Sequence, residues 1–344
     1  MSGAQSELDQ DCDSLVPGSS RGANVSVLVP VTGNASYLPD SLKSVSDEMC
    51  RFSASGGVAE LVIILHAPTS ITELICRSHL ARGQAVKFRH SKAKTLGGAL
   101  NAGLALCEGE FVARHDSDDL MLADRLIIQQ SLLRDNPDLV VVGGQILRIV
   151  KNVARSKSYL PLGHRDIVGL LLKGGHAINH GSAMLRRATL ENMGGYWDEG
   201  LSEDTDLFLR LSERGQLCNV DRAVTGYRFH DDSTTAQHLY HSRLGIELAR
   251  ENHRRRQKGR GELVKSDLYA DSNRVFRERA RRTSTAQLLY RKSLGRRTFS
   301  VFRLLYLARA AALDPSTAWR RIRGGICTPS TPLPSQASDL TTHS

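Results

Sequence analysis

The sequence of 344 residues lacks the features that define several large classes of protein. Only 5% of its residues are aromatic, and no apolar stretch approaches the roughly 20 residues that a membrane-spanning helix needs. Its six cysteines are scattered and form no Cys-x-x-Cys pair, which argues against a zinc knuckle and favours a reducing compartment over a disulfide framework. The first residues have no apolar segment of the kind found in signal peptides. We therefore expect a cytoplasmic protein without a membrane span.

An excess of positive charge is missing from most of the chain, although the whole sequence is basic. Residues 1–240 hold 24 Lys and Arg against 28 Asp and Glu, a net charge of −4, whereas residues 241–325 hold 22 against 7, a net charge of +15. The remaining residues add −1, which gives the total of +10. Net charge indicates a polyanionic partner only for the part of the chain that carries the charge. The Ser-rich ends, residues 1–23 and 326–344, are expected to be disordered.

Short β-branched runs alternate with amphipathic stretches from residue 24 onward. The expected elements are strands at 25–30, 60–65, 85–89 and 110–114 and helices at 37–49, 71–81 and 96–107. This alternation predicts an α/β fold with a mostly parallel sheet. Ligands of such sheets bind beyond the carboxyl ends of the strands. Residues 30–34, 66–70 and 116–119 are therefore expected on one rim.

Three carboxylates are clustered on this expected rim, in Asp116-Ser-Asp118-Asp119. Clustered carboxylates repel one another, and a divalent cation is one common way to relieve the repulsion. Mg²⁺ is typically held by one or two carboxylates together with substrate phosphates. The alternative is a solvated turn, because Asp and Ser favour turns.

A second acidic feature lies at a predicted helix start, where Ser202 precedes Glu203 and Asp204. The helix dipole favours ionised carboxylates in the first turn, which would keep Asp204 ready as a proton acceptor. The alternative is that these residues only stabilise the helix. Further along, His230 closes a short strand, and a neutral imidazole is a common metal ligand.

Taken in order, these segments resemble inverting glycosyltransferases of family 2, which have the GT-A fold. The carrying segments are Val25–Val31, Gly97–Leu104, Val112–Asp119, Asn179–Arg187, Gly194–Tyr196 and Glu203-Asp204. The form Ala-Arg-x-Asp-x-Asp-Asp is most similar to enzymes that build bacterial capsule, O-antigen and exopolysaccharide. The resemblance covers residues 24–235, which we expect to be a GT-A catalytic domain with a Rossmann-like sheet.

The resemblance implies a role for individual residues. Asp204 would be the general base that takes the proton of the acceptor hydroxyl, so that one displacement inverts the anomeric centre. Asp118 and His230 would hold Mg²⁺ or Mn²⁺, which neutralises the departing nucleoside diphosphate. The implied donor site consists of Pro30, Val31, His66, Asn101, Asp116, Asp118, His180 and Glu203.

The implied reaction transfers a sugar from a nucleotide-diphosphate sugar, usually UDP-linked, to a saccharide or lipid-linked saccharide in cell-surface polysaccharide synthesis. One position departs from the family. Leu65-His66 stands where family members usually place an aspartate that contacts the nucleotide base. The identity of the base therefore stays open.

Residues 236–325 are expected to form a basic helical extension. Basic amphipathic helices suit an anionic surface such as the inner face of the cytoplasmic membrane; the alternative is that they pack back on the catalytic domain. Two other classes of protein fit only part of the sequence. A nucleotidyltransferase usually has a Gly-rich phosphate loop, whereas residues 30–34 hold a single glycine. A nucleic-acid-binding protein is supported by the extension alone, so we expect no nucleic-acid partner.

Overall fold

The structure is a computed structural model that divides into two compact units, Met1–Arg277 and Glu278–Ser344. It describes residues 22–33, 36–80, 85–150, 152–200, 202–229, 239–294 and 301–315. The ends that were expected to be disordered lie almost entirely outside these residues, and so does His230.

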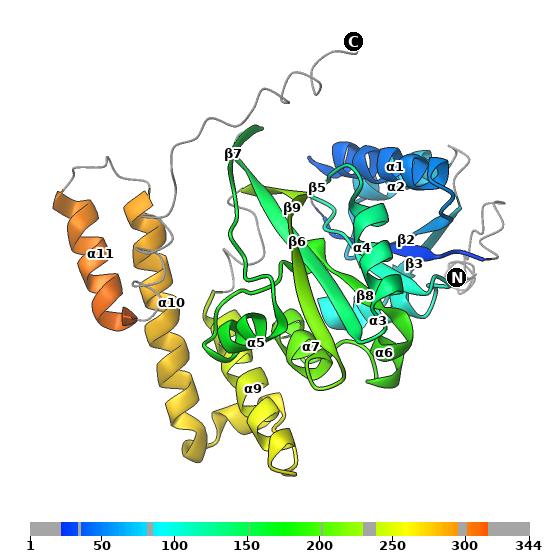
Figure 1. Ribbon diagram of the computed structural model, residues 1–344. Coiled ribbons are helices and arrows are strands. Elements are labelled where there is room, and N and C mark those ends of the chain that lie inside the picture. Colours follow the sequence, from blue (N-terminus) through cyan, green and yellow to red (C-terminus); the bar gives the residue numbers. More distant parts are fainter. Residues whose placement is uncertain are drawn as a thin grey trace, which may run out of the picture. The chain divides into compact units, whose positions relative to one another are not determined.

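In the part of the chain that the structure describes, nine strands form one mixed sheet in the first unit (Figure 1). Its order is β3-β2-β1-β4-β8-β6-β9-β5, and β7 pairs with β6. The strands are β1 (Val25–Val31), β2 (Ala59–His66), β3 (Val86–Ser91), β4 (Phe111–Arg114), β5 (Leu120–Met121), β6 (Leu139–Val150), β7 (Val153–Lys157), β8 (Met184–Arg186) and β9 (Gln216–Phe229). The pairings make β5, β7 and β8 antiparallel to the other strands, which confirms the expected α/β fold with a mostly parallel sheet.

Helices cover both faces of the sheet. The helices of the first unit are α1 (Leu38–Ala54), α2 (Ser70–Leu80), α3 (Leu96–Leu104), α4 (Arg125–Asp135), α5 (His164–Leu172), α6 (Arg187–Asn192), α7 (Glu203–Leu211) and α9 (Leu239–Gln257). One hydrophobic cluster joins the sheet to α1, α2 and α4, and a second joins it to α3, α5 and α7. The core therefore consists of two layers with the sheet between them (Figure 1).

The sequence of β1 explains this sandwich. All seven of its residues are buried, as expected for a parallel strand that is covered on both faces. Side chains alternate between faces along a strand. Val25, Val27 and Val29 accordingly pack in the α1 cluster, and Leu28 packs in the α3 cluster.

The first unit continues past residue 235, the expected end of the catalytic domain. Helix α9 buries Leu244 and Leu248 and packs against α7. Near its end, Arg256 pairs with Glu213 at 2.9 Å, and His253 Nδ1 lies 2.7 Å from the same carboxylate. This part of the expected extension therefore packs back on the sheet domain.

Candidate active site

The acidic loop, Asp116–Asp119, begins directly after β4. It lies at the edge of the sheet where the carboxyl ends of the parallel strands β1, β2 and β4 meet. Arg114, the last residue of β4, forms an ion pair with Asp116. Asp119 is 1% exposed, and its Oδ1 accepts a hydrogen bond from the backbone N–H of Arg228 at 2.9 Å. Burial, with the charges of Asp116 and Asp118 next in importance, raises the pKa of Asp119 well above its usual value. The loop is therefore a concentration of negative charge held by arginines.

The fully buried guanidinium of Arg125, on α4, stabilises the backbone on which the acidic loop begins. It donates to the carbonyl of Arg114 at 2.7 Å, to the carbonyl of Gly181 at 2.9 Å and to Gln129 Oε1 at 3.0 Å. Burial lowers the pKa of Arg125 to about 9, so the side chain is still largely charged at neutral pH. Arg125 thereby joins the end of β4 to the short turn η1 (His180–Ser182), which lies more than sixty residues after β4 in the sequence.

The turn η1 brings Gly181 against the acidic loop and His180 against Tyr196 and Phe208. Gly181 lies so close that a Cβ there would collide with Asp116 Oδ2. The ring of His180 lies 3.4 Å, Nε2 to Oη, from Tyr196 and meets Phe208 edge-on. Burial, and then the Arg114 charge, lowers the pKa of His180 well below its usual value, which keeps the imidazole neutral.

This close approach gives a first prediction, for Gly181→Ala. The added methyl group must displace Asp116 or Arg114, so we expect a nucleotide sugar to bind at least about tenfold more weakly. Titration calorimetry measures the change. The matched control is Gly169→Ala in α5, where a Cβ would meet nothing within 4 Å. Equal affinities for both variants would show that the contact does not shape the site.

Helix α7 presents the second acidic pair. Glu203 Oε1 lies 3.9 Å from His180 Nδ1, and its side chain is 18% exposed. Burial, and then the charge of Asp204, raises the pKa of Glu203 to about 7, while the nearby Arg114 guanidinium lowers it. Asp204 Oδ1 accepts from the backbone N–H of Thr205 at 2.7 Å in the first turn of the helix. The Arg114 guanidinium therefore faces carboxylates from both acidic segments.

The raised pKa of Glu203 predicts how stability depends on pH. The folded state keeps the Glu203 proton up to about pH 7, whereas the unfolded chain loses it near pH 4.5, so this group's contribution to stability falls by at most about 3 kcal/mol between those values. Glu203→Gln removes this dependence, and we expect the variant to gain stability over the wild type as pH rises. Urea unfolding across this range, without added metal, measures the difference. Parallel curves for the two proteins would contradict the prediction.

Asn101 on α3 holds the Gly-Gly-Tyr turn in place. Its amide donates to the carbonyl of Tyr196 at 2.9 Å, and its Oδ1 accepts from the Tyr196 N–H at 2.7 Å. Gly195 in this turn has a φ of +75°, which favours glycine. The Asn101 amide thus positions the Tyr196 backbone, and donor binding by Asn101 stays a prediction.

The remaining residues of the predicted donor site lie at the ends of β1 and β2. Val31 is fully buried, and the register pairs Pro30 with Ile64 and Val31 with Leu65. His66 is the last residue of β2, and its Nδ1 is buried without a hydrogen-bond partner. This ring nitrogen therefore has neither solvent nor, among the described residues, a hydrogen-bonding protein atom beside it.

Arg228 on β9 also belongs to the site, and sequence reasoning missed it. It is 7% exposed, donates from Nη1 to the carbonyl of Asp118 at 3.2 Å and from Nη2 to Asp40 Oδ2 at 3.0 Å, and stacks over the ring of Tyr37. Its partners come from distant parts of the chain. No local pattern in the sequence signals such a contact.

The residues present fit a divalent cation. Among the described residues, no group of three or more His, Cys, Asp or Glu side chains is arranged around one point. Mg²⁺ and Mn²⁺ do not need such a cage when one or two carboxylates act together with substrate phosphates. Asp119 has a buried, unpaired Oδ2 beside the charges of Asp116 and Asp118, and this repulsion is what a cation relieves.

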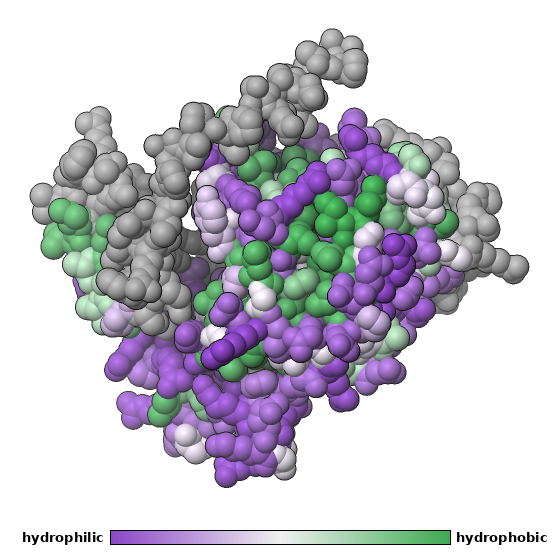
Figure 2. Space-filling view, in the orientation of Figure 1, coloured by the Kyte–Doolittle hydropathy of each residue, from purple (hydrophilic) through white to green (hydrophobic). Residues whose placement is uncertain are grey.

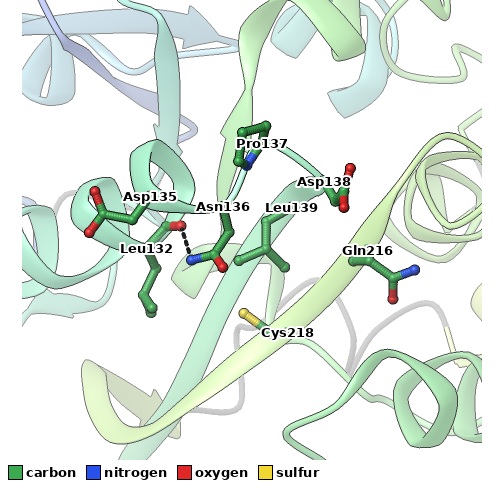
Figure 3. A pocket seen from close by; sticks show the side chains of 8 residues that line it. All are labelled: Leu132, Asp135, Asn136, Pro137, Asp138, Leu139, Gln216 and Cys218. Carbon is green, nitrogen blue, oxygen red and sulfur yellow. Dashed lines mark hydrogen bonds between the residues drawn. The ribbon is translucent and has the colours of Figure 1, made fainter.

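A surface depression of about 440 Å³ lies elsewhere (Figure 3). It is lined by Leu132, Asp135, Asn136, Pro137, Asp138, Leu139, Gln216 and Cys218. Leu139 and Gln216 are the first residues of β6 and β9. Because β6 and β9 run in the same direction as β4, this depression is at the edge of the sheet opposite the acidic loop.

Comparison with known proteins agrees with this geometry. Residues 26–194 match the family model described as "Glycosyl transferase family 2". A curated relative named amylovoran biosynthesis glycosyltransferase AmsE, from Erwinia amylovora, is 32% identical over 120 residues, which cover 35% of this chain and 45% of the relative. A UDP-Gal:alpha-D-GlcNAc-diphosphoundecaprenol beta-1,3-galactosyltransferase from Escherichia coli is 28% identical over 39% of this chain and 48% of its own length. The chain thus spans less than half the length of these relatives.

A solved structure supports the fold. The mannosyltransferase PcManGT from Pyrobaculum calidifontis, in complex with GDP-Man and Mn²⁺, superposes with a TM-score of 0.50 over 93% of this chain and 84% of its own, at 18% identity. At this identity the likeness concerns the fold, which is GT-A with additional C-terminal helices. The family match over residues 26–194, the fold and the two acidic segments agree, and together they support a family 2 glycosyltransferase with the GT-A fold.

Proposed function

We propose that the protein transfers a sugar from a nucleotide-diphosphate sugar to a hydroxyl of a saccharide or lipid-linked saccharide, with inversion at the anomeric carbon, in cell-surface polysaccharide synthesis. One observation carries the proposal. The carboxylates of Asp116 and Glu203, far apart in sequence, lie in the electrostatic reach of the same buried Arg114 guanidinium. This arrangement combines an acidic loop suited to a metal-bound diphosphate with acidic side chains suited to accept a proton.

In the proposed reaction, Asp204 accepts the proton of the acceptor hydroxyl as that oxygen attacks the anomeric carbon. It lies in the first turn of α7, where its Oδ1 accepts a hydrogen bond from the backbone N–H of Thr205. Glu203 and the neutral His180 line the buried side of the same site. Together with Tyr196, they exclude water from the position where the sugar would lie.

The acidic loop would hold the diphosphate end of the donor. Asp118 would bind Mg²⁺ or Mn²⁺, with Asp116 beside it and with His230, which lies outside the described residues, as the second protein ligand. When bound, the cation neutralises the charge that develops on the departing nucleoside diphosphate. Arg228 keeps the loop in place through the carbonyl of Asp118.

The donor base and the acceptor are proposed from chemistry and from relatives. His66 ends β2 where a base would lie, and a rotation of its ring would bring the unpaired Nδ1 within reach of an N–H such as that of uracil. The Escherichia coli relative is named for a UDP-sugar donor and a diphosphoundecaprenol acceptor. We therefore propose a UDP-linked donor and a lipid-linked acceptor.

The test is a thermal-shift screen of UDP-, GDP- and dTDP-sugars with Mn²⁺. A donor that binds only the folded protein raises the midpoint of unfolding. We expect one class of donor to do so, and we expect chelator or Asp118→Ala to abolish the shift. Asp135→Ala, which removes an exposed carboxylate on α4, is the matched control and should keep the shift. No shift with any donor, or a full shift for Asp118→Ala in chelator, would overturn the assignment.

A further inference from the structure

The net positive charge of the protein is concentrated in the second compact unit. Residues 278–344 contain 12 Lys and Arg against 3 Asp and Glu, a net charge of +9. Residues 1–277 contain the other 34 against 33, a net charge of +1. The sheet domain is thus nearly neutral once α9 is included in it.

The basic residues of α9 and the segment after it are largely engaged within the first unit. Arg254 pairs with Glu251 at 3.1 Å, and Arg256 pairs with Glu262 at 3.1 Å. Arg243 donates to the carbonyl of Gly174 at 2.9 Å. Arg243 and Arg256 thus stabilise the docking of α9, whereas Arg254 pairs with a residue of its own helix. All three cations have partners within the first unit.

The second unit contains most of α10 (Arg274–Leu294) and all of α11 (Val301–Leu313). On α11, the exposed positions recur at helical spacing and share one face: Leu304, Leu305, Ala308, Arg309 and Ala312. Leu304 is 62% exposed and Leu305 is 59% exposed, whereas Ala310 on the other side is 7% exposed. Figure 2 shows apolar side chains gathered on this helix.

We propose that the second unit binds an anionic lipid bilayer, with the exposed face of α11 inserted among the lipids and with exposed arginines of the unit, such as Arg309 on that face and Arg281 on α10, on the headgroups. The pairing of adjacent leucines with basic residues fits an interfacial helix, which buries an apolar face at the headgroup boundary. A helix of 13 residues is too short to cross a bilayer, and no helix among the described residues is both long and apolar enough to do so. If α11 contacts a bilayer, it therefore lies at the bilayer surface and does not cross it.

Charge complementarity selects this partner. Each Lys or Arg near an anionic leaflet contributes about 1 kcal/mol, or about fivefold in affinity. A nucleic acid would also attract the charge, but it offers no apolar phase for Leu304 and Leu305. The role of this binding in the reaction rests on the proposed function, because a lipid-linked acceptor would place the reaction at a membrane.

The test is co-sedimentation of the full chain with vesicles. We expect binding to an equimolar mixture of phosphatidylcholine and phosphatidylglycerol, weakening as salt rises, and no binding to phosphatidylcholine alone. The double variant Leu304→Gln, Leu305→Gln and the double variant Arg281→Glu, Arg309→Glu should each bind at least about tenfold more weakly. All four side chains are exposed, so the thermal midpoint should not change.

The matched control is Lys258→Glu with Arg260→Glu, which makes the same change in charge at exposed positions of the first unit. We expect its vesicle binding to stay within about twofold of wild type. Three results would each overturn the inference: equal losses of vesicle affinity in the two charge variants, unchanged vesicle affinity in the leucine variant, and tighter binding to duplex DNA than to vesicles. Transfer to a water-soluble acceptor without vesicles is measured separately, so failure of the proposed function would be recognised independently.

Discussion

The Asp204→Asn variant is expected to lose about 10²- to 10⁴-fold in kcat, while its affinity for the nucleotide sugar stays close to that of the wild type. The substitution keeps the shape of the side chain and removes its ability to accept a proton. The diphosphate end of the donor would bind at the acidic loop after β4, which Asp204 does not help to hold. Steady-state kinetics and calorimetry on the same preparation separate the two quantities.

Glu203→Gln is the informative companion, because the two carboxylates are adjacent. Glu203 faces Arg114 and His180, and its pKa of about 7 would also suit a general base. We expect its replacement to lower kcat less than Asp204→Asn does. A larger loss for Glu203→Gln, with Asp204→Asn still active, would transfer the role of base to Glu203.

The Arg125→Met variant is expected to lose about 3–5 kcal/mol of stability, the largest effect on folding that we expect from one side chain. Methionine fills part of the volume but leaves the carbonyls of Arg114 and Gly181 and the Gln129 Oε1 without their donor. Urea unfolding followed by circular dichroism gives the change in the free energy of unfolding.

Arg134→Met is the control for that experiment. It lies on the same helix, and its ion pair with Asp135 is exposed on both sides, so removing it should change stability by less than about 1 kcal/mol. Equal stabilities for the two variants would mean that the buried guanidinium does not hold the turn η1 to the end of β4.

The first four strands and the mostly parallel character of the sheet could be predicted, because these strands read as continuous apolar runs; the strand order and the long strands β6 and β9 were not predicted. The seven strands and helices expected before the acidic loop occur within five residues of their expected bounds, for example α2 at Ser70–Leu80. The acidic residues were predicted from their places at a strand end and a helix start. Both are local signals.

Contacts over long separations could not be predicted. Arg228 holds Asp118 and Asp40, which are 110 and 188 residues away, and nothing near Arg228 in the sequence distinguishes it from other arginines. Counting charges could not distinguish a free basic extension from one that packs back on the catalytic domain, for a similar reason. Arg256 pairs with Glu213, 43 residues earlier, and with Glu262, and only the structure shows these contacts.

The division into two units has a consequence for how such a protein changes over evolutionary time. The groups proposed to perform the chemistry lie in a nearly neutral first unit, and almost all the surplus charge lies in the second. If the second unit holds the protein at a bilayer as we propose, substitutions there that change this binding need not disturb the sheet, and substitutions in the first unit that change the sugar need not alter membrane binding. Residence and specificity are then separate traits, open to selection one at a time.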